Sequence, residues 1–240
     1  LTGIGTLVDA LYAIRRLVYE EVRLSLGELA EILASDFAGE EALRQYVIHR
    51  LPKFGHDDPE VAQFAAEVFA QVAQASSGMP NTRGGVYEAS LFSFRTFTSM
   101  GNLTGATPDG RRAGEHLSPG MSPSQLALGE QTGVGQLLRC LEALDLAQYP
   151  VVAVLDVKLP LAPAGYEPQT LLPIILRFIE CGGSVLQINC LDPATLRAAQ
   201  AHPERHPDLV VRVSGYSAYF NTLCTTLQDE IIERALVESR

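Results

Sequence analysis

The sequence has no tryptophan and no two cysteines at the spacing of a metal site. Its four cysteines, Cys140, Cys181, Cys190 and Cys224, include no Cys-x-x-Cys pair. The sequence therefore predicts neither a zinc site nor a disulfide framework. Because unpaired thiols suit a reducing compartment, we expect a cytoplasmic protein.

Long apolar runs and an excess of positive charge are also lacking. No stretch approaches the roughly 20 apolar residues that span a bilayer. The formal net charge is −10, and the acidic residues are scattered along the chain. We therefore expect no membrane insertion and no nucleic-acid partner.

The first 76 residues have the patterns of helices. Apolar residues recur at helical spacing between positions 4 and 18, and SLGE at positions 25–28 is a capping-box start for a second helix. Asp58 precedes a proline in DDPE, positions 57–60, which predicts another helix through about Gln74. A stretch rich in Gly, Pro and Ser follows at positions 76–125, with one candidate strand, ASLFSFRTF, at positions 89–97. A loop of that length is uncommon in a compact domain unless it is functional.

The last 90 residues alternate strand with helix, which predicts βαβ crossovers, a largely parallel sheet or barrel, and the α/β fold class. The expected strands are positions 151–158, 185–189 and 209–213. The expected helices are about 169–181, which stops at Gly182, 193–202, which is capped by Asp192, and an acidic tail helix over 225–236.

A single glycine, Gly215, lies in RVSGYSAYF on the expected loop between the third strand and the tail helix. Such a glycine is usually a turn residue. A second interpretation is chemical, because only a glycine Cα that has lost a hydrogen can flatten between two amide groups and delocalise an unpaired electron onto both. A buried loop would protect this radical, and we expect Tyr216, Tyr219 and Phe220 to supply the packing.

Two motifs in a fixed order resemble the signatures of a known family. VVRVSGYSAYF is similar to the radical-bearing loop of the glycyl radical enzymes, the group related to pyruvate formate-lyase. TGATPDGRRAGEHLSPGMSPSQ, positions 104–125, resembles their upstream signature, and QINCLDPATLRAAQAHPERHPDLVVRV resembles the segment that joins the two. The similarity covers nearly the whole chain.

The resemblance implies the fold and the modified residue. It implies the C-terminal part of a ten-stranded α/β barrel with a helical N-terminal segment, in which residues 1–112 close the barrel domain and residues 113–240 form the glycine radical domain. It implies that Gly215 carries the radical. A separate activating enzyme that uses S-adenosylmethionine and an iron–sulfur cluster installs it, so we expect no bound cofactor and no metal in this chain.

The cysteine that this family uses has no counterpart here. By resemblance, the glycyl radical takes a hydrogen from a cysteine that lies upstream of both signatures. Cys140 begins a Cys-x-Glu pattern but lies downstream of TPDGRR on a leucine-rich helix, so we expect a core residue, as we do for the other three cysteines. A chain that starts at Leu1 also suggests a C-terminal piece, either a fragment or half of a split enzyme, inactive alone.

The resemblance also implies partners and a reaction class. The expected partners are the activating enzyme, an upstream barrel portion with the catalytic cysteine, a small-molecule substrate and a second copy in a full-length homodimer. The sequence around Gly215 is more similar to that of a dehydratase or carbon–heteroatom lyase acting on small polyols, hydroxyproline or choline-like substrates. The alternatives are acyl transfer between pyruvate and coenzyme A, a non-catalytic radical-carrying subunit, and an inert fragment.

Four other residues have two interpretations each. Asp109, Arg111 and Arg112 in TPDGRR could form a catalytic group, but an Asp-Gly turn followed by arginines more often ties a loop together, and we expect that structural role. Arg234 on the tail helix could point into the cavity, as an arginine does in some related dehydratases, but we expect it to be exposed.

Overall fold

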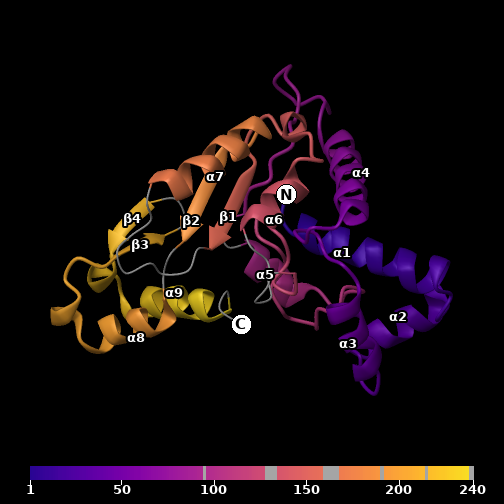
Figure 1. Ribbon diagram of the computed structural model, residues 1–240, viewed down its shortest axis with the longest axis horizontal. Helices are drawn as coiled ribbons and strands as arrows, with labels where there is room; N and C mark the ends of the chain where they lie inside the picture. Colours follow the sequence, from indigo (N-terminus) through magenta and orange to yellow (C-terminus); the bar gives the residue numbers. More distant parts are fainter. Residues whose placement is uncertain (94–95, 128–133, 159–167, 190–191, 214–215, 238–240) are drawn as a thin grey trace.

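The computed structural model describes the chain except residues 94–95, 128–133, 159–167, 190–191, 214–215 and 238–240. The described part is a mixed α/β structure that is mostly helical (Figure 1). None of its helices is both long and apolar enough to cross a membrane. The helices are α1 (Ile4–Ile14), α2 (Leu26–Ala34), α3 (Glu41–Arg50), α4 (Pro59–Ser76), α5 (Thr96–Leu103), α6 (Val134–Leu141), α7 (Pro168–Glu180), α8 (Pro193–Ala201) and α9 (Thr225–Val237). The strands are β1 (Val154–Lys158), β2 (Val185–Asn189), β3 (Val210–Val213) and β4 (Tyr216–Tyr219).

Local capping signals explain where several helices begin. The Ser25 hydroxyl accepts from the backbone N–H of Glu28 at 3.2 Å, and the Glu28 carboxylate accepts from the Ser25 N–H at 2.7 Å, so the predicted capping box is confirmed. The Asp58 side chain caps α4 by accepting hydrogen bonds from backbone N–H groups of its first turn. The sequence did not predict α3, which buries only Val47 and lacks an apolar stripe.

The first two strands form the predicted parallel pair. β1 and β2 pair in register from Val154 opposite Val185 onward, and α7 connects them and lies along the sheet (Figure 1). α7 ends at Glu180 as expected, before Gly182, whose φ of +80° terminates the helix.

The third strand corrects the prediction. β3 does not join this sheet but pairs antiparallel with β4, from Val210 opposite Tyr219 to Val213 opposite Tyr216. The expected strand-to-helix loop after β3 is therefore wrong, because YSAY is itself a strand. Ala218 packs against the core while its neighbours Ser217 and Tyr219 are exposed, which is the two-residue alternation of a half-buried strand.

Two of the three hydrophobic cores in the described part of the chain matter for the site. The larger one joins α1, α4, α6, α7 and β1, and it includes Leu91 and Leu155. The smaller one joins α8, β3 and α9 around the fully buried Phe220 and shares no residue with the larger one. The boundary predicted between residues 112 and 113 stays a prediction, and the larger core contains residues from both sides of it.

The segment 104–127, here called the strap, has no helix or strand in its described residues but is held to α1 and β1 by hydrogen bonds. Ser118 and Thr6 of α1 exchange two hydrogen bonds of 3.0 Å, each between a backbone N–H and the other residue's hydroxyl. The N–H of Met121 donates to the carbonyl of Val154 in β1 at 3.0 Å. At Gly120 any Cβ would lie 2.7 Å from that same carbonyl oxygen, so a glycine is needed there. The strap thus ties α1 to β1.

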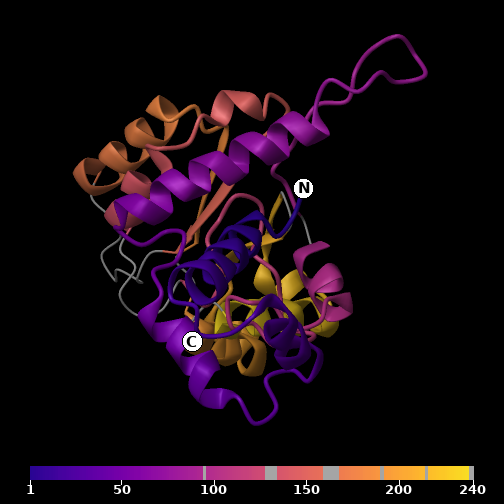
Figure 2. The same cartoon turned by 90° about the vertical axis from the view of Figure 1, so that its right-hand side faces the viewer.

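The region between α4 and the strap also differs from the expectation. The candidate strand at positions 89–97 is wrong over most of its length, because among its described residues only Leu91 pairs, with Ala153, and α5 already begins at Thr96. Before it, residues 77–88 form a hairpin that extends from the end of α4 away from the rest of the molecule (Figure 2).

Candidate functional site

The candidate radical residue lies between the two strands of the small hairpin. β3 and β4 pair up to Val213 and Tyr216, and the residues between them, Ser214 and Gly215, lie outside the described residues. The prediction of Gly215 as the radical site therefore stays a prediction. The structure defines what holds the two strands beside it.

The hairpin is anchored at the end opposite Gly215. The N–H of Phe220 donates to the carbonyl of Leu209 at 2.8 Å, and the amide of Asn221 donates to the carbonyls of Pro203 and His206 at 2.9 and 2.8 Å. The amide of Gln228 in α9 donates to the carbonyl of Phe220 at 2.9 Å. These bonds fix the strands to α9 and to the segment after α8.

The aromatic residues that follow Gly215 do not all shield it. Phe220 is fully buried, as expected, but Tyr219 is 52% exposed, so its expected packing role within this chain is wrong. The side chain of Tyr216 lies outside the described residues.

The TPDGRR turn has the predicted structural role. The Arg111 guanidinium donates to the backbone carbonyls of Thr104, Gly105, Arg112 and Glu115. Arg112 donates to the carbonyl of Asp36 at 2.8 Å and to the carboxylate of Glu41 at 2.7 Å. Both arginines therefore hold the strap in place.

Three ionisable side chains are buried beside the strap. Asp9 of α1 is 2% exposed, Lys53 is 1% exposed and Asp109 is fully buried. Burial raises the pKa of Asp9 to about 7, although the Lys53 ammonium opposes that change, and it raises the pKa of Asp109. Burial lowers the pKa of Lys53 against the attraction of both carboxylates. The sequence analysis identified neither Asp9 nor Lys53.

The raised pKa of Asp9 predicts a pH-dependent stability. The folded chain binds a proton at Asp9 below about pH 7, whereas the unfolded chain does so only below its usual 3.8. The contribution of Asp9 to the free energy of unfolding is therefore complete at low pH and is lost as pH rises through 7. The loss is about 4 kcal/mol for a pKa shift of about 3 units. We expect Asp9→Asn to remove this fall, as measured by urea unfolding between about pH 4 and pH 8.

Asp57 provides the matched control for this titration. It is exposed, and the hydrogen bond from Arg139 lowers its pKa, so its contribution changes in the opposite direction, decreasing as pH falls. Asp57→Asn should therefore leave the Asp9-dependent fall unchanged. An Asp9→Asn variant with the same pH dependence as the parent would contradict the prediction.

The described cysteines differ in their surroundings. Cys140 is 2% exposed, its sulfur accepts from the Gly55 N–H at 3.4 Å, and burial raises its pKa to about 11, so the expected core role is confirmed. Cys181 is half-buried. Cys224 is exposed, so its expected core role is wrong. Cys190 lies outside the described residues.

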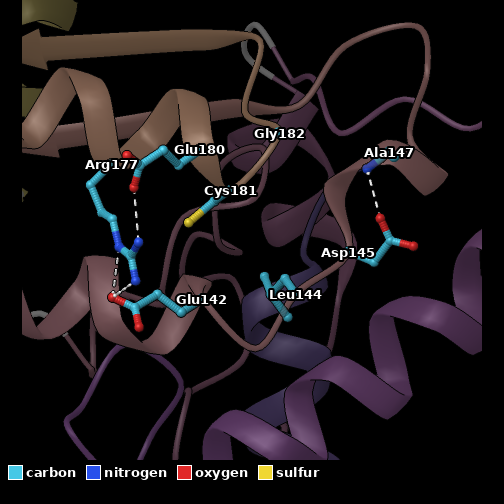
Figure 3. A pocket seen from close by; sticks show the side chains of 8 residues that line it. All are labelled: Glu142, Leu144, Asp145, Ala147, Arg177, Glu180, Cys181 and Gly182. Atoms are coloured by element: carbon cyan, nitrogen blue, oxygen red, sulfur yellow. Dashed lines mark hydrogen bonds and ion pairs between the residues drawn. The ribbon is translucent and has the colours of Figure 1, made fainter.

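A cavity of about 430 Å³ lies where α7 meets the turn after α6 (Figure 3). Its Arg177 pairs with Glu142 at 2.7 Å and with Glu180 at 2.8 Å, and Asp145 accepts from the N–H of Ala147 at 3.2 Å. Because these charges already have partners, the cavity offers none of them to a ligand, and we assign it none.

The candidate substrate-binding residue, Arg234, belongs to α9. Its side chain lies outside the described residues, so both of its interpretations stay open.

Two family descriptions match the chain. "Pyruvate formate lyase-like" matches residues 1–101, and "Glycine radical" matches residues 166–221, a range that contains β3, β4 and Gly215.

Relatives with this similarity are much longer than the chain. It is 30% identical over 233 residues to trans-4-hydroxy-L-proline dehydratase of Clostridioides difficile, covering 97% of this chain and 29% of that protein. It is 32% identical over 238 residues to isethionate sulfite-lyase of Nitratidesulfovibrio vulgaris, covering 97% and 28%. A solved structure concerning 1,2-propanediol dehydration in Roseburia inulinivorans superposes with a TM-score of 0.83 at 33% identity, over 96% of this chain and 30% of that one. The chain thus belongs to the glycyl radical enzyme family and corresponds to the C-terminal portion with the glycine radical domain.

Proposed function

We propose that this chain is the radical-carrying portion of a glycyl radical dehydratase or carbon–heteroatom lyase, with the radical on Gly215. The observation that carries the proposal is the glycine radical match over residues 166–221, a range that includes Gly215 and the paired strands on either side of it. A separate activating enzyme that uses S-adenosylmethionine and an iron–sulfur cluster installs the radical. The three described cysteines are free thiols, which suits a reducing cytoplasm.

The relatives support elimination from a small polar substrate. Two are named for removing a small group, water from trans-4-hydroxy-L-proline or sulfite from isethionate, and the solved structure concerns dehydration of 1,2-propanediol. All three substrates are small and polar. We therefore propose a substrate of this class.

The chain needs an upstream portion that supplies the rest of a barrel. The chain spans about 30% of its relatives, and Tyr219, at the end of β4 away from Gly215, is half exposed. α7 is apolar on a second face, since four of its large side chains are 38% to 59% exposed at helical spacing: Leu172, Ile175, Leu176 and Ile179. A helix that is apolar all round is typical of a larger core. We propose that this upstream portion covers these surfaces and carries the cysteine that receives the radical from Gly215.

A non-catalytic radical-carrying subunit is the second candidate. The separate small core around Phe220 favours it, because the hairpin that flanks Gly215 packs without a residue of the larger core. In that role the chain would dock on a partner whose own radical site is lost.

Complementation tests the proposal. The activated chain alone should give no product from 1,2-propanediol, trans-4-hydroxy-L-proline, isethionate, or pyruvate with coenzyme A. Addition of the upstream portion of a homologous dehydratase, which contains the cysteine, should restore elimination, measured as aldehyde, dehydrated amino acid or sulfite. Acetyl-coenzyme A as the product would instead indicate acyl transfer.

Two variants make the result specific. Gly215→Ala should abolish the restored activity, because no radical can form at that position. Cys140→Ser should keep it, because a buried thiol with a raised pKa lies in the core. Product from the isolated chain, or loss of restored activity in a folded Cys140→Ser variant, would show that Cys140 is the missing cysteine.

A further inference from the structure

The buried charges near the strap come from three segments that are distant in sequence. Asp9 belongs to α1, Lys53 to the connection between α3 and α4, and Asp109 to the strap. Asp9 contacts the other two segments, since its carboxylate accepts from the N–H of Phe54 and from the hydroxyl of Ser124, each at 2.7 Å. One buried carboxylate therefore joins the neighbour of Lys53 to the end of the strap.

Asp109 holds the other part of the strap. Its carboxylate accepts from the Thr107 hydroxyl, and the adjacent carbonyl of Gly110 accepts from Arg44 of α3 at 2.8 Å. The second carboxylate oxygen of Asp109 is buried and has no hydrogen-bond partner in the described part of the chain. The Asp109 charge is stabilised by the bond from Thr107, by a backbone hydrogen bond from Arg111 and, at a distance, by the charges of Lys53 and Arg111.

Lys53 is the buried cation that both aspartates share. In the described part of the chain its ammonium donates one hydrogen bond, to the neutral carbonyl of Val47 at 2.7 Å, and the opposite charges of Asp9 and Asp109 act on it without a hydrogen bond to it. Removal of one member of a buried charge group leaves the others uncompensated, whereas neutralising the whole group is often tolerated. The three side chains should thus act as one unit.

We propose that Asp9, Lys53 and Asp109 form a charge latch that holds the strap against α1 and α3. Loss of the Lys53 ammonium releases the strap as a local unit, while the helices outside it stay folded. This role is independent of the radical chemistry proposed above.

Hydrogen exchange measured by mass spectrometry tests the latch. Lys53→Met keeps the unbranched apolar stem and removes the charge. At about pH 8, strap peptides from 104–127 should exchange about tenfold faster than in the parent, with α4 changed by less than about threefold. Addition of Asp9→Asn and Asp109→Asn to Lys53→Met should return strap exchange to within about threefold of the parent.

The pH dependence separates a charge effect from lost packing. The charges that act on Asp9 are those of Lys53 and Asp109. The charges that act on Asp109 are those of Lys53 and Arg111. The nearby Cys140 thiol stays neutral because its pKa is about 11. Without the ammonium both carboxylates hold protons more strongly, so the variant-to-parent ratio should fall toward one at about pH 5.5. Ser118→Ala, which removes only the uncharged bond from the Thr6 N–H to the Ser118 hydroxyl, should accelerate strap exchange equally at both pH values.

Four results would overturn the latch. These are unchanged strap exchange in Lys53→Met, equal acceleration of the strap and α4, a ratio that is the same at both pH values, and no recovery in the triple variant. If Lys53→Met is unfolded at about pH 8, the latch predicts that the same variant is folded at about pH 5.5 and that the triple variant is folded at about pH 8. Unfolding in all three cases would refute it.

Discussion

We expect Gly215→Ala to abolish the radical signal that the parent chain should give after anaerobic treatment with a matched activating enzyme and S-adenosylmethionine. In the parent we expect an EPR doublet, because the unpaired electron couples to the one hydrogen left on the glycine Cα. Alanine has a methyl group there, which prevents the planar backbone centre from forming in the same way. The expected effect is complete loss of the doublet.

Two controls make this result specific to the backbone of one residue. Glycine deuterated at Cα should collapse the doublet of the parent toward a singlet. Gly105→Ala is the matched substitution, since Gly105 has open space where a Cβ would lie and no left-handed φ, and it should keep the doublet. Activation is measured on the chain assembled with the upstream portion. A doublet that survives Gly215→Ala would place the radical elsewhere.

The helix starts were predictable because they depend on neighbours in sequence. Ser25, Asp58 and Asp192 each accept from a backbone N–H two or three residues further on, so a short pattern contains the whole interaction. α3 lacks such a pattern: its N-cap residue, Glu40, makes no side-chain cap hydrogen bond, and Val47 is its only buried residue. Its position comes from tertiary packing, which propensity does not reveal.

The pairing of β3 was not predictable from the same kind of pattern. β1, β2 and β3 each have the composition of a buried strand, yet only the first two pair together. The partner of β3 is β4, whose four residues alternate weakly and follow a glycine that suggested a turn. A strand of that length depends on its neighbour for its definition.

The buried charges show the same limit at the candidate site. The contacts of Asp9 reach 45 and 115 residues along the chain, to Phe54 and Ser124, and no local motif contains them. One signal was present in the composition, since Lys53 is one of two lysines in a chain with 18 basic residues. Gly215, by contrast, was accessible from sequence because its proposed chemistry needs only glycine and a familiar flanking motif.

Air exposure should cut the activated chain at Gly215. A Cα radical combines with dioxygen to give a peroxyl species, and because the centre is in the main chain, its breakdown cleaves the polypeptide. Mass spectrometry should find a C-terminal peptide that contains residues 216–240 and a larger piece that ends at or beside Ser214. The unactivated chain should stay whole, since an ordinary turn glycine does not react with dioxygen.

The position of the cut distinguishes the radical from adventitious damage. Gly215 lies between β3 and β4, and the bonds of Phe220 and Asn221 hold the opposite end of the hairpin, so a nick there should leave the small core associated until denaturant is added. A general oxidant would instead modify the exposed Cys224 and cut no single peptide bond. Activated, EPR-positive protein that stays intact in air, or that breaks elsewhere, would rule out Gly215 as the radical site while leaving the family assignment in place, because that assignment rests on similarity over the whole chain.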